Sequence, residues 1–252
     1  MPRSFWKISF VFFATVFFFV GVREAVALSL SPALIEVEAE PGESLVQKIN
    51  LFNETDQLLT VYSRTENFKP QKNTPAPQFL GDADLFGAAR WIIPPVKKIA
   101  LKSGEQTEIL LKIKIPDAAE PGGHYAALLW SEKPVEDAGI GTASRIGTLF
   151  LFKIKGETKE DTKIISFQNT FKNQLVEFVL RLQNDGNVHL KIGGMIEIVN
   201  WRGKTIARLP INPKGQSILP QSQRNFTVFW ENNGALPAFG INFNFTFRRS
   251  DF

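Results

Sequence analysis

The residues that could do chemistry in this chain are few and widely spaced. Histidine occurs only at His124 and His189, and cysteine does not occur at all. Protein zinc sites draw on several histidine, cysteine or carboxylate ligands at short spacing, and cysteine nucleophiles need a thiol. His124 follows two glycines at the start of a strand pattern, and His189 falls on the outward side of its strand pattern. We therefore interpret both as packed or solvated side chains and predict no metal site and no cofactor.

The carboxylates also fall where strands and turns leave them in solvent. A glycosidase needs two carboxylates facing each other across a cleft. Glu36, Glu38 and Glu40 lie on the outward side of one strand pattern, and the others fall in turns. Asp82 and Asp84 have the spacing of a calcium loop, but the glycine and the downstream glutamate of an EF-hand are missing. No catalytic residue is predicted, and a wall-active hydrolase would require two carboxylates that converge in the folded chain.

The remaining candidates for contact with a ligand are aromatic. The segment 68–95 contains five prolines and little alternation, so we expect a long loop packed over one edge of a sandwich. It carries Phe79, Phe86 and Trp91, and Trp201 sits at the tip of a predicted hairpin. These four residues are the predicted ligand-binding set. The competing interpretation is that aromatic residues of a β-sandwich fill its core or its edges.

The elements that would position these residues are almost all strands. Apolar and polar residues alternate with period two in many short segments, and turns rich in Gly, Pro and Asn separate them. The pattern predicts an all-β chain of two tandem immunoglobulin-like β-sandwiches, at residues 28–156 and 162–252, with a charged linker between them. Alternation predicts that one face of each sheet packs and that the other face is wet.

The first 27 residues have the layout of a secretory signal peptide. Arg3 and Lys7 flank an apolar run at 8–22, and Ala25-Val26-Ala27 provides a cleavage site. The alternative is an uncleaved anchor, although the run is shorter than the roughly 20 residues that span a bilayer comfortably. We expect an extracytoplasmic protein, secreted or at the cell surface, that contacts membrane only through this segment if it stays uncleaved. The absence of cysteine favours a bacterial origin, and the net charge of +4 does not indicate a nucleic-acid partner.

The order of short motifs resembles that of bacterial WxL-interacting cell-surface proteins. In the first domain the motifs are Leu30-Ser31-Pro32, Pro41-Gly42-Glu43, Trp91-Ile92-Ile93-Pro94, the turn at 101–105, Ile115-Pro116-Asp117 and the segment 121–125; in the second they are the segment 182–187 and Leu219-Pro220. The resemblance implies a peptidoglycan-binding first domain and a second domain for partner proteins. Those proteins usually end in a transmembrane helix, whereas this sequence ends after a strand pattern, so it is either a secreted relative or incomplete at its C-terminus.

The chain also resembles periplasmic pilus chaperones, which consist of two sandwiches behind a signal peptide. Those chaperones use a basic residue of the first strand to hold the terminal carboxylate of a subunit, and residues 28–40 contain no Lys or Arg. We therefore expect an exported, non-enzymatic protein that binds a cell-wall polymer such as peptidoglycan, or another surface protein. The alternative is an assembly chaperone for exported subunits, which a basic pair between the two domains would favour.

Overall fold

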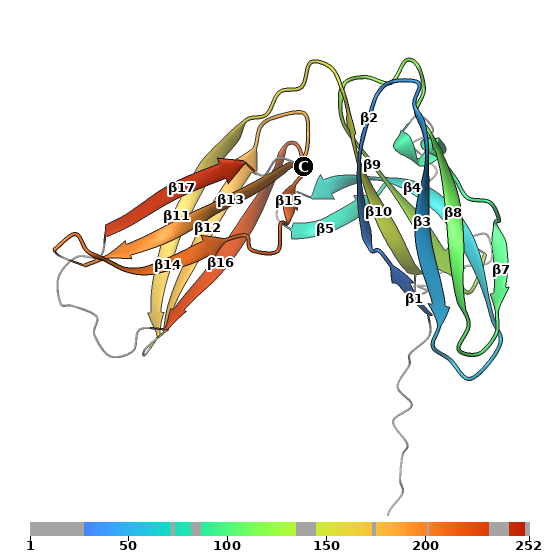
Figure 1. The fold of residues 1–252 in the computed structure, drawn as a ribbon, viewed down its shortest axis with the longest axis horizontal. Helices are drawn as coiled ribbons and strands as arrows, with labels where there is room; N and C mark the ends of the chain where they lie inside the picture. Colours follow the sequence, from blue (N-terminus) through green and yellow to red (C-terminus); the bar gives the residue numbers. More distant parts are fainter. Residues whose placement is uncertain are drawn as a thin grey trace, which may run out of the picture.

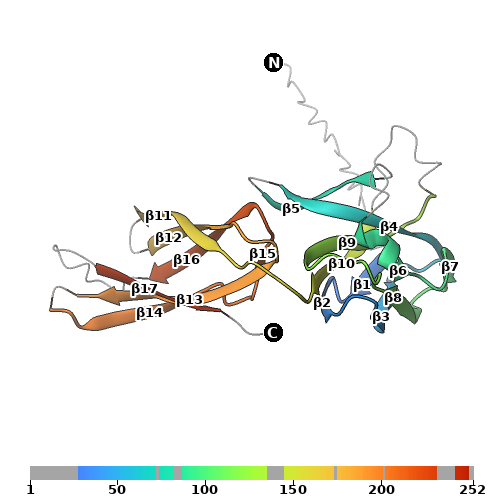
Figure 2. The same cartoon turned by 90° about the horizontal axis from the view of Figure 1, so that it is seen from above.

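The structure is a computed structural model of the chain, and it describes residues 28–71, 74–81, 87–134, 145–172, 175–200, 202–231 and 242–249. The predicted signal peptide at 1–27 lies outside the described residues. Strands dominate the described part, and they form two β-sandwiches that meet at an angle (Figure 1). Viewed from above, the hairpin of β4 and β5 reaches from the first sandwich toward the second (Figure 2). The predicted all-β class, with immunoglobulin-like sandwiches, is confirmed.

The first sandwich consists of two sheets built from residues 28–154. One sheet has the order β1-β3-β8-β6, with β1 Leu28–Ser31, β3 Ser44–Asn53, β8 Gln106–Lys114 and β6 Ile92–Ile93. The other has the order β2-β10-β9-β4-β5, with β2 Leu34–Ala39, β10 Arg145–Ile154, β9 Gly122–Ser131, β4 Leu59–Gln71 and β5 Thr74–Phe79; β7 (Lys98–Leu101) also pairs with β4. The first extended segment is thus divided between the sheets, because β1 pairs with β3 whereas β2 runs parallel to β10.

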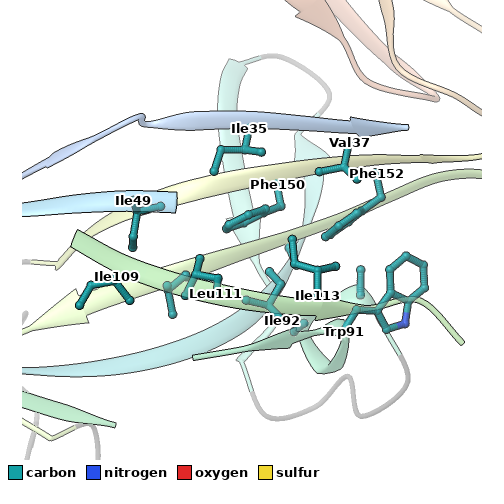
Figure 3. Packing of buried hydrophobic residues seen from close by; sticks show 14 of the residues in the cluster. Ile35, Val37, Ile49, Trp91, Ile92, Ile109, Leu111, Ile113, Phe150 and Phe152 are labelled. Carbon is teal, nitrogen blue, oxygen red and sulfur yellow. The ribbon is translucent and has the colours of Figure 1, made fainter. Parts of the chain in front are cut away.

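The core of this sandwich follows the period of two in its strands. Ile109, Leu111 and Ile113 of β8 are buried, and the residues between them are exposed. Figure 3 shows Ile35 and Val37 of β2 pointing into the core beside Phe150 and Phe152 of β10. Successive side chains of a strand point to opposite faces, so the residues of β2 that alternate with these two face away from the core.

The segment 68–95 is not a long loop, and this expectation is corrected. β4 continues to Gln71 and pairs with β5 in an antiparallel hairpin, in which Pro70 faces Pro77. Proline cannot donate a backbone hydrogen bond, but an edge strand leaves one side of its backbone unpaired and tolerates it. The short helix η2 (Ala88–Trp91) and β6 follow. Three of the five prolines that suggested a loop, Pro70, Pro75 and Pro77, therefore occupy an edge hairpin.

The second sandwich repeats this arrangement with residues 162–249. One sheet has the order β11-β12-β16, with β11 Thr162–Lys172, β12 Leu175–Asn184 and β16 Ser222–Glu231. The other contains β14 (Thr205–Ile211), β13 (Leu190–Val199), β15 (Ser217–Ile218) and β17 (Asn242–Arg249). Val176, Phe178, Leu180 and Leu182 of β12 all point into its core.

Each sandwich has a buried asparagine at the end of an equivalent strand, the second in the order of its sheet. The amide nitrogen of Asn53, at the end of β3, lies 3.0 Å from the carbonyl oxygen of Leu101 and 2.8 Å from that of Gln57. The amide nitrogen of Asn184, at the end of β12, lies 2.7 Å from the carbonyl oxygen of Val188 and 2.9 Å from that of Ile218. Each side chain thus ties a loop to a neighbouring strand and satisfies buried carbonyl groups.

Candidate functional site at the domain junction

Of the four predicted ligand-binding aromatics, the structure describes Phe79 and Trp91, and these two pack in different apolar clusters. Phe86 and Trp201 lie outside the described residues. Phe79 ends β5 and packs edge-to-face on Phe68 at a centroid distance of 6.2 Å. Trp91 is only 6% exposed and packs in the core, 5.2 Å from Phe152 and 4.8 Å from His124 between ring centroids. Trp91 therefore occupies the position of a packing residue rather than that of an exposed platform, and it belongs to a different apolar cluster from the one that contains Phe68.

Part of the outer face of the sheet β2-β10-β9-β4, over β9, β10 and the end of β4, is apolar and buried, which corrects the expectation that this face is wet. Phe68, Ala127, Leu129 and Leu151 are buried there, and they pack with Tyr125, Leu149 and, from the second sandwich, Leu219. We call this surface the outer apolar face. Strands buried on both faces have continuous apolar sequences instead of alternating ones, and the sequence of β9, which includes Ala126-Ala127-Leu128-Leu129-Trp130, has this character.

A group of polar residues joins the two sandwiches beside this face. We call it the junction cluster, and it consists of Glu36, Tyr125, Lys153, Glu160, His189, Lys191 and Ser217. The carboxylate of Glu36 in β2 accepts hydrogen bonds from the Lys191 ammonium of β13 and, at 2.8 Å, from the Ser217 hydroxyl of β15. The Lys153 ammonium of β10 lies 3.5 Å from the Glu160 carboxylate of the linker. A basic pair, Lys153 and Lys191, thus lies between the domains, and each lysine has a carboxylate partner.

His189 is part of this cluster, so its predicted outward, solvated position is wrong. Its side chain is 1% exposed and packs against Tyr125 with 5.9 Å between the ring centroids. The pKa of His189 is lowered to about 4, mainly by burial and in part by the nearby lysines Lys153 and Lys191, whereas Glu36 and Glu160 act in the opposite direction. Burial likewise raises the pKa of the Tyr125 hydroxyl. His189 is therefore neutral at pH 7 and acts as a packing group of the junction.

Two glycines allow the close approach of the domains. The Gly123 amide donates a hydrogen bond of 2.8 Å to the Asn187 carbonyl of the second domain. A Cβ atom on Gly123 would lie 2.1 Å from the Tyr125 hydroxyl oxygen and 3.2 Å from the Asn187 carbonyl oxygen. Gly122 has a φ of +131°, which side chains rarely adopt. In the sequence these two glycines precede His124 at the start of a strand pattern, and their role in a domain contact was not predicted.

The edge strand β2, beside the junction, has backbone amide and carbonyl groups that no neighbouring strand pairs with in the described part of the chain. The amides of Leu149 and Lys155 in and after β10 donate to the carbonyls of Ala33 and Ala39, so the odd-numbered residues of β2 bond to β10. By the period of two, the amide and carbonyl groups of Leu34, Glu36 and Glu38 point away from β10. Among the strands that the structure describes, β2 pairs only with β10, so this side of β2 is an open edge.

The described residues contain neither a metal-binding cluster nor a membrane-spanning helix. They include no group of three or more His, Asp or Glu side chains placed to hold a metal ion. None of the helices in the described part of the chain is long and apolar enough to cross a membrane. The chemistry available at the junction is instead that of binding, through apolar contact, paired charges and unpaired backbone groups of an edge strand.

Comparison with known proteins gives no family for this chain. No family model matches it, and no curated protein matches it. Among solved structures, the class 5 fimbriae chaperone CfaA is 11% identical, with 86% of this chain and 98% of that chain covered and a TM-score of 0.44. The Escherichia coli chaperone DraB is 11% identical, with 90% and 98% covered and a TM-score of 0.38. A chain of the CsuC–CsuE chaperone–tip adhesion subunit complex of Acinetobacter baumannii is 13% identical, with 79% and 89% covered and a TM-score of 0.41.

These likenesses concern the fold, and half of this chain also matches 23% of a family 123 glycoside hydrolase with a TM-score of 0.33. The fimbrial chaperones nevertheless contradict the expected main function, an exported structural or binding protein attached to peptidoglycan or a surface partner. That interpretation is corrected, and the alternative, an assembly chaperone, is taken up below as a proposal. No finding bears on the resemblance to WxL-interacting proteins, which stays a prediction.

Proposed function

We propose that this chain is an exported, non-enzymatic assembly chaperone that holds protein subunits destined for the cell exterior. One observation carries the proposal: the open edge of β2 lies at the angle between the two sandwiches, directly beside the outer apolar face. A subunit whose last strand is unpaired exposes both apolar side chains and backbone groups. An open sheet edge satisfies the backbone groups by strand addition, and the neighbouring apolar surface covers the side chains.

Leu34 is the residue where these two features meet. It is 43% exposed, at the start of β2, and its neighbour in the sheet is Leu149 of the outer apolar face. An exposed leucine at an open edge favours association with another chain, because edge strands are templates for pairing. The protein partner is thus better supported than a polysaccharide, which has no backbone amides and carbonyls to pair with an open strand edge.

The basic pair at the junction supports the same proposal. Lys153 and Lys191 come from β10 and β13, in different domains, rather than from the first strand. Their side chains are 18% and 26% exposed, and Glu160 and Glu36 neutralise them. A carboxylate of a subunit would have to compete with these internal partners, so the pair is not a general anion site.

Site-specific photo-crosslinking in the producing cell tests the proposal. A benzophenone amino acid replaces Leu34 at the open edge in one variant of the full chain and Val46 in a matched control. Val46 is 57% exposed but lies on β3, in the opposite sheet. We expect crosslinks from position 34 to an exported protein subunit that becomes insoluble when the chain is deleted. Equal crosslinks from both positions, or a partner whose solubility is independent of the chain, would refute the proposal.

A further inference from the structure

Most of the side chains along the open edge of β2 are acidic. Leu34, Glu36, Glu38 and Glu40 follow one another at a spacing of two, so their side chains share the face that points away from the core. Ile35, Val37 and Ala39, on the other face, are buried. The edge therefore presents one apolar side chain followed by three carboxylates.

The lysines nearby balance this charge only in part. Lys191 pairs with Glu36, and Lys155 pairs with Glu40 at 3.1 Å. Lys153 is the neighbour of Glu38 in the sheet, but its ammonium lies beside Glu160. Glu43 adds a further carboxylate, which accepts a hydrogen bond from the Glu40 amide. Five carboxylates thus surround three lysines, and Glu38 is exposed in the middle of the open edge.

We propose that the open edge of β2 takes an extended basic segment of the subunit, with lysine or arginine side chains opposite Glu38 and Glu40 and an apolar side chain opposite Leu34. This inference rests on the proposed function and specifies its substrate class. Directly opposed residues of neighbouring strands have Cβ atoms about 4.5–5.5 Å apart, and opposite charges there stabilise pairing whereas like charges destabilise it. The edge therefore discriminates by charge between segments of equal strand propensity.

Position 38 offers a way to block pairing without disturbing the fold. The amide of Glu38 points away from β10, so a proline there removes a hydrogen-bond donor that the sheet does not use. Val37, which precedes it, is already in an extended strand, as a residue before proline requires. Glu38→Pro should therefore remove strand addition and charge together, Glu38→Gln should remove only the charge, and Glu38→Lys should reverse it.

The test measures binding of two synthetic peptides to the full chain by fluorescence anisotropy. Both have eight residues; one alternates Lys with Val and the other alternates Glu with Val. We expect the Lys–Val peptide to bind at least ten-fold more tightly than the Glu–Val peptide. Glu38→Gln should weaken the Lys–Val peptide about three- to ten-fold, Glu38→Lys should reverse the preference, and Glu38→Pro should abolish binding of both. Circular dichroism confirms that each variant stays folded.

Two results would overturn the inference. One is equal binding of both peptides by the wild-type chain, and the other is unchanged Lys–Val binding by a folded Glu38→Pro variant. The proposed function fails separately. If position 34 crosslinks to a subunit but Glu38→Pro holds that subunit as well as the wild type does, the chaperone function stands and the basic-segment inference falls. If no subunit depends on the chain, the proposed function itself falls.

Discussion

The burial of His189 predicts a specific loss of stability in acid. In the folded chain the pKa of His189 is about 4, whereas its ordinary value is 6.5. Between these two values the unfolded chain binds a proton that the folded chain excludes, so stability falls as pH falls. At about 1.4 kcal/mol for each pKa unit, the gap corresponds to about 3 kcal/mol of the free energy of unfolding. This contribution is complete above pH 6.5 and is lost by about pH 4.

The variant His189→Gln isolates this contribution, because glutamine is polar but does not titrate in this range. Urea unfolding at several pH values between 7 and 4 gives the free energy of unfolding for both proteins. We expect the difference between wild type and variant to change by about 3 kcal/mol across that range, with the wild type losing more. Carboxylates remote from His189 that titrate in the same window contribute equally to both curves and cancel in the difference; Glu36 and Glu160, which interact with His189, do not.

Parallel curves for the two proteins would refute this reasoning, because they would mean that His189 is accessible to protons in the folded state. A direct check is the chemical shift of the His189 ring, which should stay constant from pH 7 down to about pH 5. A titration midpoint near 6.5 would place the ring in solvent and would contradict the packing of the junction against Tyr125.

Two further predictions concern the stability of the first sandwich. Asn53→Ala should lower the free energy of unfolding by about 3 kcal/mol, because it leaves several carbonyl groups without their buried donor. Urea unfolding measures this loss, and a loss below about 1 kcal/mol would mean that these hydrogen bonds do not stabilise the fold as proposed. Trp91→Ala should cost about 3–5 kcal/mol by leaving a cavity beside Phe152. In the folded fraction of this variant, a crosslinker at position 34 should capture the subunit as it does in the wild type. A ligand-stacking role of Trp91 predicts instead that crosslinking is lost while the fold is kept.

The sequence predicted the strands well because their packing is local and periodic. The alternation of Ile109, Leu111 and Ile113 with polar residues requires one buried face, and the structure has it. The same logic failed for β9, where Ala127 and Leu129 are buried on the face expected to be wet. Alternation of apolar and polar residues shows that one face of a sheet is buried. When a second domain also covers the other face, the strand becomes apolar throughout and the alternation disappears.

The junction could not be predicted for the same reason. Lys153 and Lys191 are 38 positions apart in sequence and become neighbours of one cluster only through the angle between the sandwiches. His189 alternates with apolar residues as a solvated side chain would, so the pattern alone could not distinguish solvent from a neighbouring domain. The informative signal was the pair Gly122 and Gly123, since a glycine at a strand start indicates that another backbone approaches closely.

The six residues of β2 (Leu34–Ala39) contact the core, the second domain and the neighbouring strand, and they also form the open edge of the proposed function. Ile35 and Val37 point into the core, and Glu36 points the other way and holds the second domain through Lys191 and Ser217. One edge of β2 bonds to β10, so both faces and one edge are already in use near Glu36. The remaining edge is the part of β2 available to another chain, and Glu38 sits on it. Because Glu36 and Glu38 belong to one strand, a segment bound at this edge lies against the same strand that contacts the second domain.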